Sequence, residues 1–318
     1  MNNYLLYKIT YTLHKLGFYY YSVKYYVKDN YNKSSNLFFI NFFNFISILI
    51  KALFKEIKIF SSKSGYLEYL EIPITTKCTL QCKDCSNLIP YYKNSCTINI
   101  DKLLESIDIF LKCIKNIVYV RVLGGEPFIC PNLTHILKIL LDNKKIQRVE
   151  IVTNGTIIPK EQELINVLSN KKIIISISQY PNVNTDSLIT FLKTNNITYK
   201  IDKINFWMDY GDTKKRYKTI KELKKQFRSC NHICNSLLNG QLHLCPRSSH
   251  GTDLGIIANN EDDYLNLLDS NITLEDKQKK IFSLLKRKYI VACDYCDFAT
   301  KQSKKINVAE QINPPANN

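Results

Sequence analysis

The stretch EIPITTKCTLQCKDCSNLIPYY, residues 71 to 92, places Cys78, Cys82 and Cys85 in a CxxxCxxC spacing. With 11 cysteines in 318 residues, chance would produce this spacing somewhere in the chain about one time in eighty. Three thiolates in one tight loop can hold three irons of a [4Fe-4S] cube and leave the fourth iron without a protein ligand. The spacing therefore predicts an iron-sulfur site with an open position for a substrate or cofactor.

These cysteines are not expected to form disulfides. Their total of 11 is odd, and the N-terminus MNNYLLYKIT lacks the basic, apolar and small-residue regions of a secretory signal. A cytoplasmic location is therefore expected, where clustered cysteines more often bind metal or take part in catalysis. With 45% hydrophobic and 23% charged residues, the chain can bury a full core.

From residue 66 onward, short β-rich runs alternate with helical ones. Strands are predicted at 66–75, 118–125, 148–155, 171–178 and 197–204, and helices at 101–115, 133–143, 160–170 and 186–196. Five β/α repeats predict an α/β fold with a parallel sheet, which could close into a barrel or remain open. The active site of such a sheet lies beyond the carboxyl ends of its strands.

The loops after the predicted strands carry further signals. The cysteine loop follows the first strand, and the sequence GGEP, Gly124 to Pro127, follows the second. Its two glycines would let a ligand approach the backbone, and Glu126 offers a carboxylate there. TNG, residues 153–155, follows the third strand. The fourth predicted strand supplies the polar side chains of Ser176, Ser178 and Gln179.

The cysteine loop and the GGEP loop together resemble those of the radical S-adenosylmethionine (SAM) superfamily, and the resemblance covers residues 71 to 155. It implies a partial (βα)6 barrel of the TIM-like kind, which requires a further β/α unit beyond residue 204. It also implies that Cys78, Cys82 and Cys85 hold the catalytic [4Fe-4S] cluster. The remaining residues that the resemblance assigns to SAM or the substrate are Gly124, Gly125, Glu126, Pro127, Asn154, Ser176 and Ser178. The usual aromatic residue before the last cysteine is here Asp84, so the adenine contact must come from elsewhere.

The resemblance implies a radical enzyme, an oxidoreductase or isomerase. One electron from the cluster would cleave SAM to methionine and a 5′-deoxyadenosyl radical, which abstracts hydrogen from the substrate. The substrate expected is an anionic or carbohydrate small molecule, such as a sugar or a nucleotide-linked compound, undergoing dehydrogenation or epimerisation. A flavodoxin or ferredoxin would supply the electron. The alternatives are a SPASM-type peptide maturase and a non-catalytic iron-sulfur or zinc protein.

A second cysteine group follows in the C-terminal third. It comprises Cys230, Cys234, Cys245, Cys293 and Cys296. The sequence LNGQLHLCP predicts a β-hairpin that turns at Asn239 and Gly240 and delivers Cys245. The spacing is similar to the opening of SPASM and Twitch extensions, and a single closing CxxC fits the one-cluster Twitch type better. The resemblance implies an auxiliary [4Fe-4S] cluster with Cys234 as the spare thiol, while zinc would accept the same ligands.

The N-terminal region is the most basic part of the chain. Residues 1–65 hold nine lysines against Asp29 and Glu56, within a formal net charge of +16 for the whole protein. Residues 37–54 predict an amphipathic helix, because their polar positions follow one helical stripe. Such a helix could pack on the catalytic domain or adhere through residues 37–60 to the anionic inner face of a membrane. No nucleic-acid partner is expected, since no binding module is recognised.

The predicted organisation has four parts: a helical extension at 1–65, a radical SAM core at 66–228, an auxiliary cluster region at 229–300 and a polar, disordered tail at 301–318. Outside the two cysteine groups, Cys96, Cys113 and Cys130 are expected to be small buried residues. His135 is expected to pack or lie at the surface, and His243 is expected to be exposed.

Overall fold

A computed structural model describes residues 65–230 and 234–312. The predicted amphipathic helix and the rest of the basic extension lie outside these residues. The chain divides between residues 68 and 69, close to the predicted start of the core. No helix of the described part is long and apolar enough to span a membrane.

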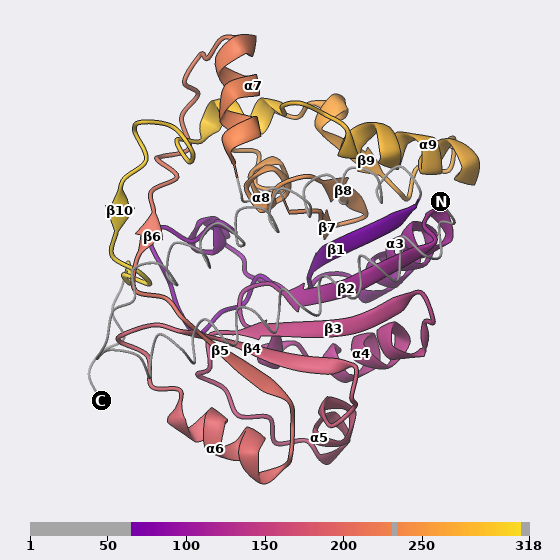
Figure 1. Cartoon of the computed structure of the whole chain (residues 1–318), viewed down its shortest axis with the longest axis vertical. Coiled ribbons are helices and arrows are strands. Elements are labelled where there is room, and N and C mark those ends of the chain that lie inside the picture. Colours follow the sequence, from indigo (N-terminus) through magenta and orange to yellow (C-terminus); the bar gives the residue numbers. More distant parts are fainter. Residues whose placement is uncertain (1–64, 231–233, 313–318) are drawn as a thin grey trace, which may run out of the picture. The chain divides into compact units, whose positions relative to one another are not determined.

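Five β/α repeats form the main body, as the sequence predicts. The strands are β1 (Tyr66–Pro73), β2 (Asn116–Leu123), β3 (Ile146–Thr153), β4 (Ile173–Gln179) and β5 (Tyr199–Lys203). The helices between them are α3 (Ile100–Cys113), α4 (Leu133–Asp142), α5 (Gln162–Leu168) and α6 (Asp186–Thr194). The pairs β2–β3, β3–β4 and β4–β5 are all parallel. The predicted α/β architecture is confirmed, and Figure 1 shows the strands fanning from β1 to β5.

Local sequence explains these elements. The side chain of Asn99 caps α3 by accepting a hydrogen bond from the backbone N–H of Lys102 at 3.0 Å. Apolar residues at helical spacing, including Ile107 and Phe110, bury the inner face of α3. In the middle of the sheet, Val149 and Ile151 alternate along β3 and are completely buried. Hydrophobic burial therefore fixes which face of each strand meets the helices.

The other edge of the sheet was not predicted. The strand order is β5-β4-β3-β2-β1-β7-β8-β9, in which β7 (Ser236–Leu238) runs parallel to β1. The strands β7, β8 (Gln241–His243) and β9 (Tyr264–Asn266) follow in antiparallel pairs. The sixth parallel strand of the main sheet is thus β7 beside β1, and it lies beyond residue 204, where the resemblance placed a further β/α unit. In the described part of the chain, no closed barrel forms.

The predicted hairpin at Asn239 and Gly240 is confirmed as the connection between β7 and β8. Both residues have positive φ values, of 49° and 80°, as a type I′ turn requires. Cys245 follows β8 and is the N-cap of α8 (Pro246–Asp253). The region also contains α7 (Ile220–Ser229) and α9 (Leu274–Leu285), which Figure 1 shows above β1.

The prediction of a disordered tail from residue 301 is wrong for the described residues up to 312. Strand β10 (Lys305–Ile306) pairs antiparallel with β6 (Trp207–Met208) as a separate two-stranded sheet. The following residues continue to Gln311 and form a bridge with Cys82. The segment is polar and short, but hydrogen bonds to distant parts of the chain give it a defined path.

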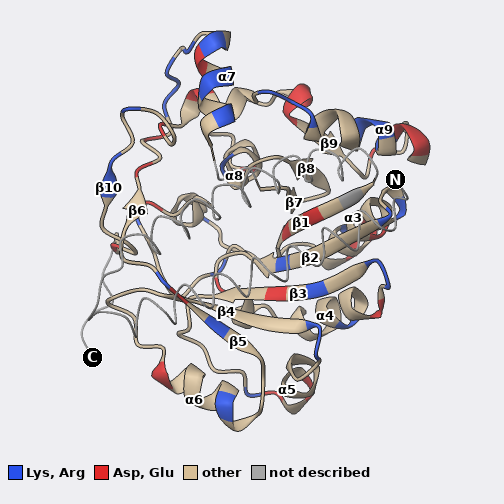
Figure 2. Ribbon diagram, viewed as in Figure 1, with Lys and Arg blue, Asp and Glu red and all other residues tan. Residues whose placement is uncertain are grey.

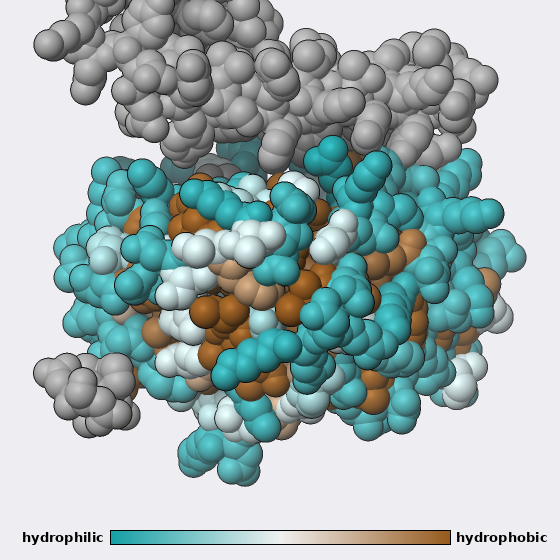
Figure 3. All heavy atoms as spheres, turned by 90° about the horizontal axis from the view of Figure 1, so that it is seen from below, coloured by the Kyte–Doolittle hydropathy of each residue, from teal (hydrophilic) through white to brown (hydrophobic). Residues whose placement is uncertain are grey.

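The exterior is polar for the most part. Figure 3 shows one face, on which hydrophilic side chains surround a smaller apolar area.

Candidate active site

The three cysteines of the first group lie on one loop immediately after β1. Cys82 is buried, while Cys78 and Cys85 are partly exposed. The backbone N–H of Cys85 donates to the carbonyl of Cys82 at 3.2 Å, which makes the loop tight. Burial raises the pKa of Cys78 to about 11, and the nearby carboxylate of Glu126 and thiol of Cys85 raise it further. Burial is also the main cause that raises the pKa values of Cys82 and Cys85.

Donor groups surround these sulfur atoms. The backbone N–H of Leu80 donates to Cys78 Sγ at 3.4 Å, and Asn154 Nδ2 lies 3.6 Å from the same sulfur. Gln311 Nε2 donates to Cys82 Sγ at 3.3 Å. N–H donors of this kind stabilise thiolate ligands, so the loop fits an iron-sulfur cluster chemically. Within the described ranges, however, no three His, Cys, Asp or Glu side chains already converge on one metal position.

The GGEP loop packs directly against the cysteine loop. The backbone N–H of Gly125 donates to the carbonyl of Thr75, and that of Glu126 donates to the carbonyl of Lys77, both at 2.8 Å. A Cβ at Gly124 would lie 2.3 Å from Thr75 O, and one at Gly125 would lie 2.0 Å from Lys77 O. The two glycines are therefore needed because the backbone of the cysteine loop packs against them. The sequence alone did not reveal this contact.

Glu126 is completely buried between the loops after β2 and β3. Its Oε1 accepts hydrogen bonds from Thr153 Oγ1 at 2.8 Å and from the N–H of Phe128 at 3.2 Å. Its Oε2 accepts from the N–H of Asn154 at 2.9 Å. Burial nevertheless raises the pKa of Glu126 to about 7, because these donors offset only part of the desolvation cost. The carboxylate ties the two loops together at the position beside the cysteines.

This burial predicts a pH-dependent stability for the metal-free chain. Folded Glu126 has a pKa of about 7 and holds its proton up to about that pH, whereas an unfolded glutamate loses it near pH 4.5. The free energy of unfolding should therefore fall as the pH rises from 5 to 8, by up to about 3 kcal/mol. Urea denaturation of the wild type and Glu126→Gln at several pH values checks this, because the variant lacks the titration.

The matched control is Glu163→Gln, since Glu163 is an exposed carboxylate that pairs with Lys138. This substitution should leave the fall in stability between pH 5 and 8 in place. A constant difference between wild type and Glu126→Gln across that range would contradict the assignment of the titration to Glu126.

A cavity of about 650 Å³ lies at the carboxyl ends of β4 and β5. Its lining includes Gln179 at the end of β4, Tyr180 and Thr185 of the loop that follows, and Lys203 of β5. Gln179 Nε2 donates to Thr185 Oγ1 at 3.1 Å, which orders that wall. The cavity is close to the first cysteine group, since Tyr180 of its lining packs against the cluster that contains Cys82. Burial is the main cause that raises the pKa of Tyr180, and the thiols of Cys82, Cys85 and Cys78 raise it further.

Tyr180 and Trp207 were missed in the sequence. Their rings meet edge to face, with centroids 5.7 Å apart, and both pack beside Cys82. Ser178 forms a hydrogen bond with Tyr180, so this predicted site residue also belongs to the cysteine side of the structure. The pair brings aromatic rings beside the cluster loop, in which Asp84 stands at the usual aromatic position. The signal that could have found Tyr180 is its position directly after β4, a strand whose carboxyl end lies at the site.

A layer of charged side chains crosses the sheet on the face opposite the helices. Arg121 Nε donates to Glu150 Oε2 at 2.8 Å, and its NH1 donates to Glu71 Oε1 at 3.2 Å. Lys200 Nζ lies 2.7 Å from Glu150 Oε1. Figure 2 shows these acidic and basic segments side by side on β1, β2, β3 and β5. Polar residues at alternate positions of otherwise buried strands were the signal that could have found them.

The pKa shifts show how this layer is balanced. Burial raises the pKa of Glu71 despite Arg121, whereas Arg121 and Lys200 outweigh burial and lower the pKa of Glu150. The predicted site residue Ser176 belongs to the same layer, because its hydroxyl donates to Asp202 Oδ2 at 2.7 Å. The charges are thus mostly paired with one another, which leaves a polar floor without a large excess of either sign.

The second cysteine group also gathers in space. Burial raises the pKa of Cys245 to about 12, and the nearby thiols of Cys296 and Cys230 contribute. Burial likewise raises the pKa of Cys293, followed by the effects of Cys245, Cys296 and Cys230. Cys234 faces a different environment, because its strongest neighbour after burial is Glu71 of the charged layer. No three of these side chains converge on one metal position among the described residues, so a four-thiol site with Cys234 as the spare stays a prediction.

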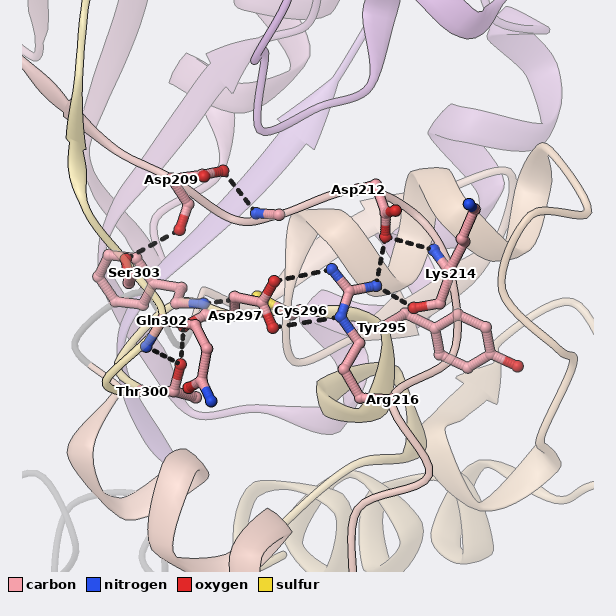
Figure 4. A network of polar contacts seen from close by, with 12 residues as sticks. Asp209, Asp212, Lys214, Arg216, Tyr295, Cys296, Asp297, Thr300, Gln302 and Ser303 are labelled. Carbon is pink, nitrogen blue, oxygen red and sulfur yellow. Dashed lines mark hydrogen bonds and ion pairs between the residues drawn. The ribbon is translucent and has the colours of Figure 1, made fainter.

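An ion-pair network holds the loop that carries the last two cysteines (Figure 4). Arg216 makes a two-pronged contact with Asp297, at 3.2 Å and 2.8 Å, and also pairs with Asp212 at 2.7 Å. Lys218 Nζ donates to the carbonyls of Cys293 and Cys296. Two-pronged arginine contacts fix geometry as well as adding stability. The loop is therefore positioned by charge before any metal is bound.

The remaining sequence predictions have mixed outcomes. Cys113 and Cys130 are buried as expected, but Cys96 is exposed. His135 lies at the surface. His243 was expected to be exposed and is instead almost completely buried, because its ring stacks on Tyr264 with centroids 5.0 Å apart.

Comparison with known proteins adds to this geometry. No family model matches the chain. It is 19% identical to the GTP 3',8-cyclase of Petrotoga mobilis over 180 residues, 56% of this chain and 54% of that protein. It is 29% identical over 109 residues to the subtilosin biosynthesis protein AlbA of Bacillus subtilis, 33% of this chain and 22% of that protein. These similarities agree with the resemblance of the cysteine and GGEP loops to the radical SAM superfamily.

The relatives support the cofactors predicted from the cysteine motif, a [4Fe-4S] cluster and SAM. It spans at most about half the length of the curated relatives quoted above. Among solved structures, that of BtrN in complex with AdoMet and 2-DOIA is similar with a TM-score of 0.47 and 13% identity, covering 72% of this chain and 92% of that one.

Proposed function

We propose that the protein is a radical SAM enzyme that cleaves SAM reductively and abstracts a hydrogen atom from a small polar substrate. The observation that carries the proposal is the meeting of three loops at the carboxyl edge of the sheet. The loop after β1 brings the three thiols, the loop after β2 brings Glu126, and the loop after β3 brings Asn154 to the sulfur of Cys78. Active sites of parallel α/β sheets lie at this edge.

Each residue then has a defined task. Cys78, Cys82 and Cys85 are the proposed ligands of a [4Fe-4S] cluster, which with SAM supplies one-electron cleavage to a 5′-deoxyadenosyl radical. The GGEP backbone and Asn154 position SAM beside them, and Glu126 holds both loops at the correct separation. Tyr180 and Trp207 offer the apolar surface that adenine needs and exclude water from the reacting carbon.

The proposed substrate is a carbohydrate or a nucleotide-linked small molecule that is dehydrogenated or epimerised. The cavity beside Tyr180 is lined by amides, hydroxyls and Lys203, which suit hydroxylated compounds. The paired charges of the layer around Arg121 add hydrogen-bonding groups. A flavodoxin or ferredoxin is the proposed electron donor, and contact of residues 37–60 with a membrane surface remains part of the proposal.

A simple assay tests the reaction class. The iron-reconstituted protein is reduced with dithionite and mixed with SAM, and 5′-deoxyadenosine is measured by chromatography. Its formation is expected even without substrate, because reduced radical SAM clusters cleave SAM slowly. A fully loaded protein that produced none would refute the proposal. Nucleotide sugars and free sugars with deuterium at ring carbons would then identify the substrate through transfer of the label to 5′-deoxyadenosine.

Peptide modification is the second candidate. The similarity to AlbA, named for bacteriocin biosynthesis, favours it over about a third of the chain. The same labelling assay distinguishes the two, because a peptide substrate would place deuterium from an amino-acid Cα or side chain into 5′-deoxyadenosine.

The second cysteine group is the proposed site of an auxiliary [4Fe-4S] cluster, with zinc as the alternative occupant. Four partly exposed thiols and the positive charges of Lys218 and Arg247 near Cys296 suit an anionic cluster. Such a closed site cannot bind SAM, so its role would be to pass an electron or shape the substrate pocket.

A further inference from the structure

The described end of the chain covers the first cysteine loop. Residues 305–312, called here the C-terminal strap, first pair with β6 and then run antiparallel to the loop. The backbone N–H of Lys83 donates to the carbonyl of Glu310 at 2.8 Å, and that of Ile312 donates to the carbonyl of Gln81 at 2.9 Å. The loop that carries the triad is therefore hydrogen-bonded to a segment more than 200 residues away.

The side chain of Gln311 makes three contacts within this pairing. Its Oε1 accepts a hydrogen bond from the N–H of Gln81 at 2.6 Å. Its Nε2 donates to the carbonyl of Ala309 at 2.6 Å and to Cys82 Sγ at 3.3 Å. Both ends of the amide are thus fixed, and its orientation directs an N–H at the sulfur.

The strap also removes this sulfur from solvent. Cys82, Val308 and Ala309 form a small buried cluster, each less than a tenth exposed. Leu80, Tyr180 and Trp207 pack against it. A thiolate in this position would lose water as a hydrogen-bond donor, and Gln311 supplies a replacement.

We propose that the C-terminal strap is part of the cluster site and that Gln311 is a positioning residue for Cys82. Its amide orients the sulfur and stabilises negative charge on it, which favours the reduced cluster and raises the reduction potential. The strap excludes water from the same face of the loop. The effect on the potential rests on the proposed function, whereas the shielding of Cys82 does not.

Shielding is measured on the metal-free, reduced, full-length chain. Mass spectrometry follows alkylation of Cys82 by iodoacetamide in wild type, Ala309→Asp and Asn307→Ala. Ala309→Asp puts a carboxylate into the apolar cluster and should raise the alkylation rate of Cys82 about tenfold. Asn307 is an exposed strap residue, so Asn307→Ala should leave the rate unchanged. Cys245, in the other cysteine group, reports whether the rest of the fold is intact.

The potential is measured on the iron-loaded chain by redox titration of the electron paramagnetic resonance signal that added SAM perturbs. Gln311→Met keeps the length of the side chain but removes the N–H donor. The variant should bind the same amount of iron and be reduced about tenfold less favourably, which is about 59 mV for one electron. Asn307→Ala should match the wild type.

Each measurement tests a separate part of the proposal. Equal alkylation of Cys82 in wild type and Ala309→Asp, with Cys245 unchanged, would show that the strap does not shield the sulfur. An unchanged midpoint in Gln311→Met would remove the role of Gln311. A chain that bound no iron would refute the proposed function and the role in the potential together, and alkylation would still test the strap.

Discussion

Replacing Cys82 by alanine should abolish SAM cleavage, with 5′-deoxyadenosine falling to the background of unloaded protein. A cube held by two thiolates is not retained at an open-iron site, so the iron content should fall from roughly eight to roughly four per chain. The fold should survive, because the substitution removes one sulfur from a small cluster at the edge of the core and costs about 1 kcal/mol. Iron analysis, product chromatography and thermal unfolding provide the three measurements.

Cys96 supplies the matched control, since it lies shortly after the triad and is exposed. Cys96→Ala should keep all iron and full SAM cleavage. If Cys82→Ala still produced 5′-deoxyadenosine at the wild-type rate, the assignment of the triad would be wrong.

Replacing Cys293 and Cys296 together by alanine should have a different outcome. About half of the iron should be lost, slow SAM cleavage should persist, and formation of product from the true substrate should stop. The reason is that the two thiols belong to the proposed closed site, which could not bind SAM. Cys234 connects this region with the charged layer, because it is near Glu71. Zinc at this site would appear as about four irons and one zinc in the wild type, with loss of the zinc in the variant.

The control for this pair is Cys234→Ser. Cys234 is near Glu71 and Tyr69 as well as Cys245 and is the proposed spare thiol, so this variant should keep the metal of the second group. Retention of all metal by the double variant, or survival of turnover, would require another account of the five cysteines.

The repeats and the loops that carry the chemistry were predictable because they are local. Strands such as β3 and helices such as α3 follow hydrophobic periods that the sequence displays directly. Cys78, Cys82 and Cys85 are close in the chain, so their proximity needed no tertiary information. The same holds for the hairpin at Asn239 and Gly240, whose turn residues specify its geometry.

Other features depend on contacts between distant residues. The strap has no periodic pattern, and its path is set by hydrogen bonds to Gln81 and Lys83 rather than by its own composition. His243 is buried because Tyr264 of the next strand stacks on it. The sequence suggests that Gly124 and Gly125 let a ligand approach, whereas the backbone of Thr75 and Lys77 occupies the space beside them. In each case the partner is too far away in sequence to be recognised.

The pairing of β7 with β1 limits how the second cysteine region can be engineered. The N–H of Glu71 donates to the carbonyl of Asn235 at 2.6 Å, so the second cysteine region extends the same sheet that ends in the first cysteine loop. An appended module joined by a linker could be removed or exchanged, but this one completes a sheet edge. Deleting it would expose the unpaired backbone of β1 and invite association with other chains. Transplanting this region onto the sheet of another protein would therefore require grafting β1 together with it.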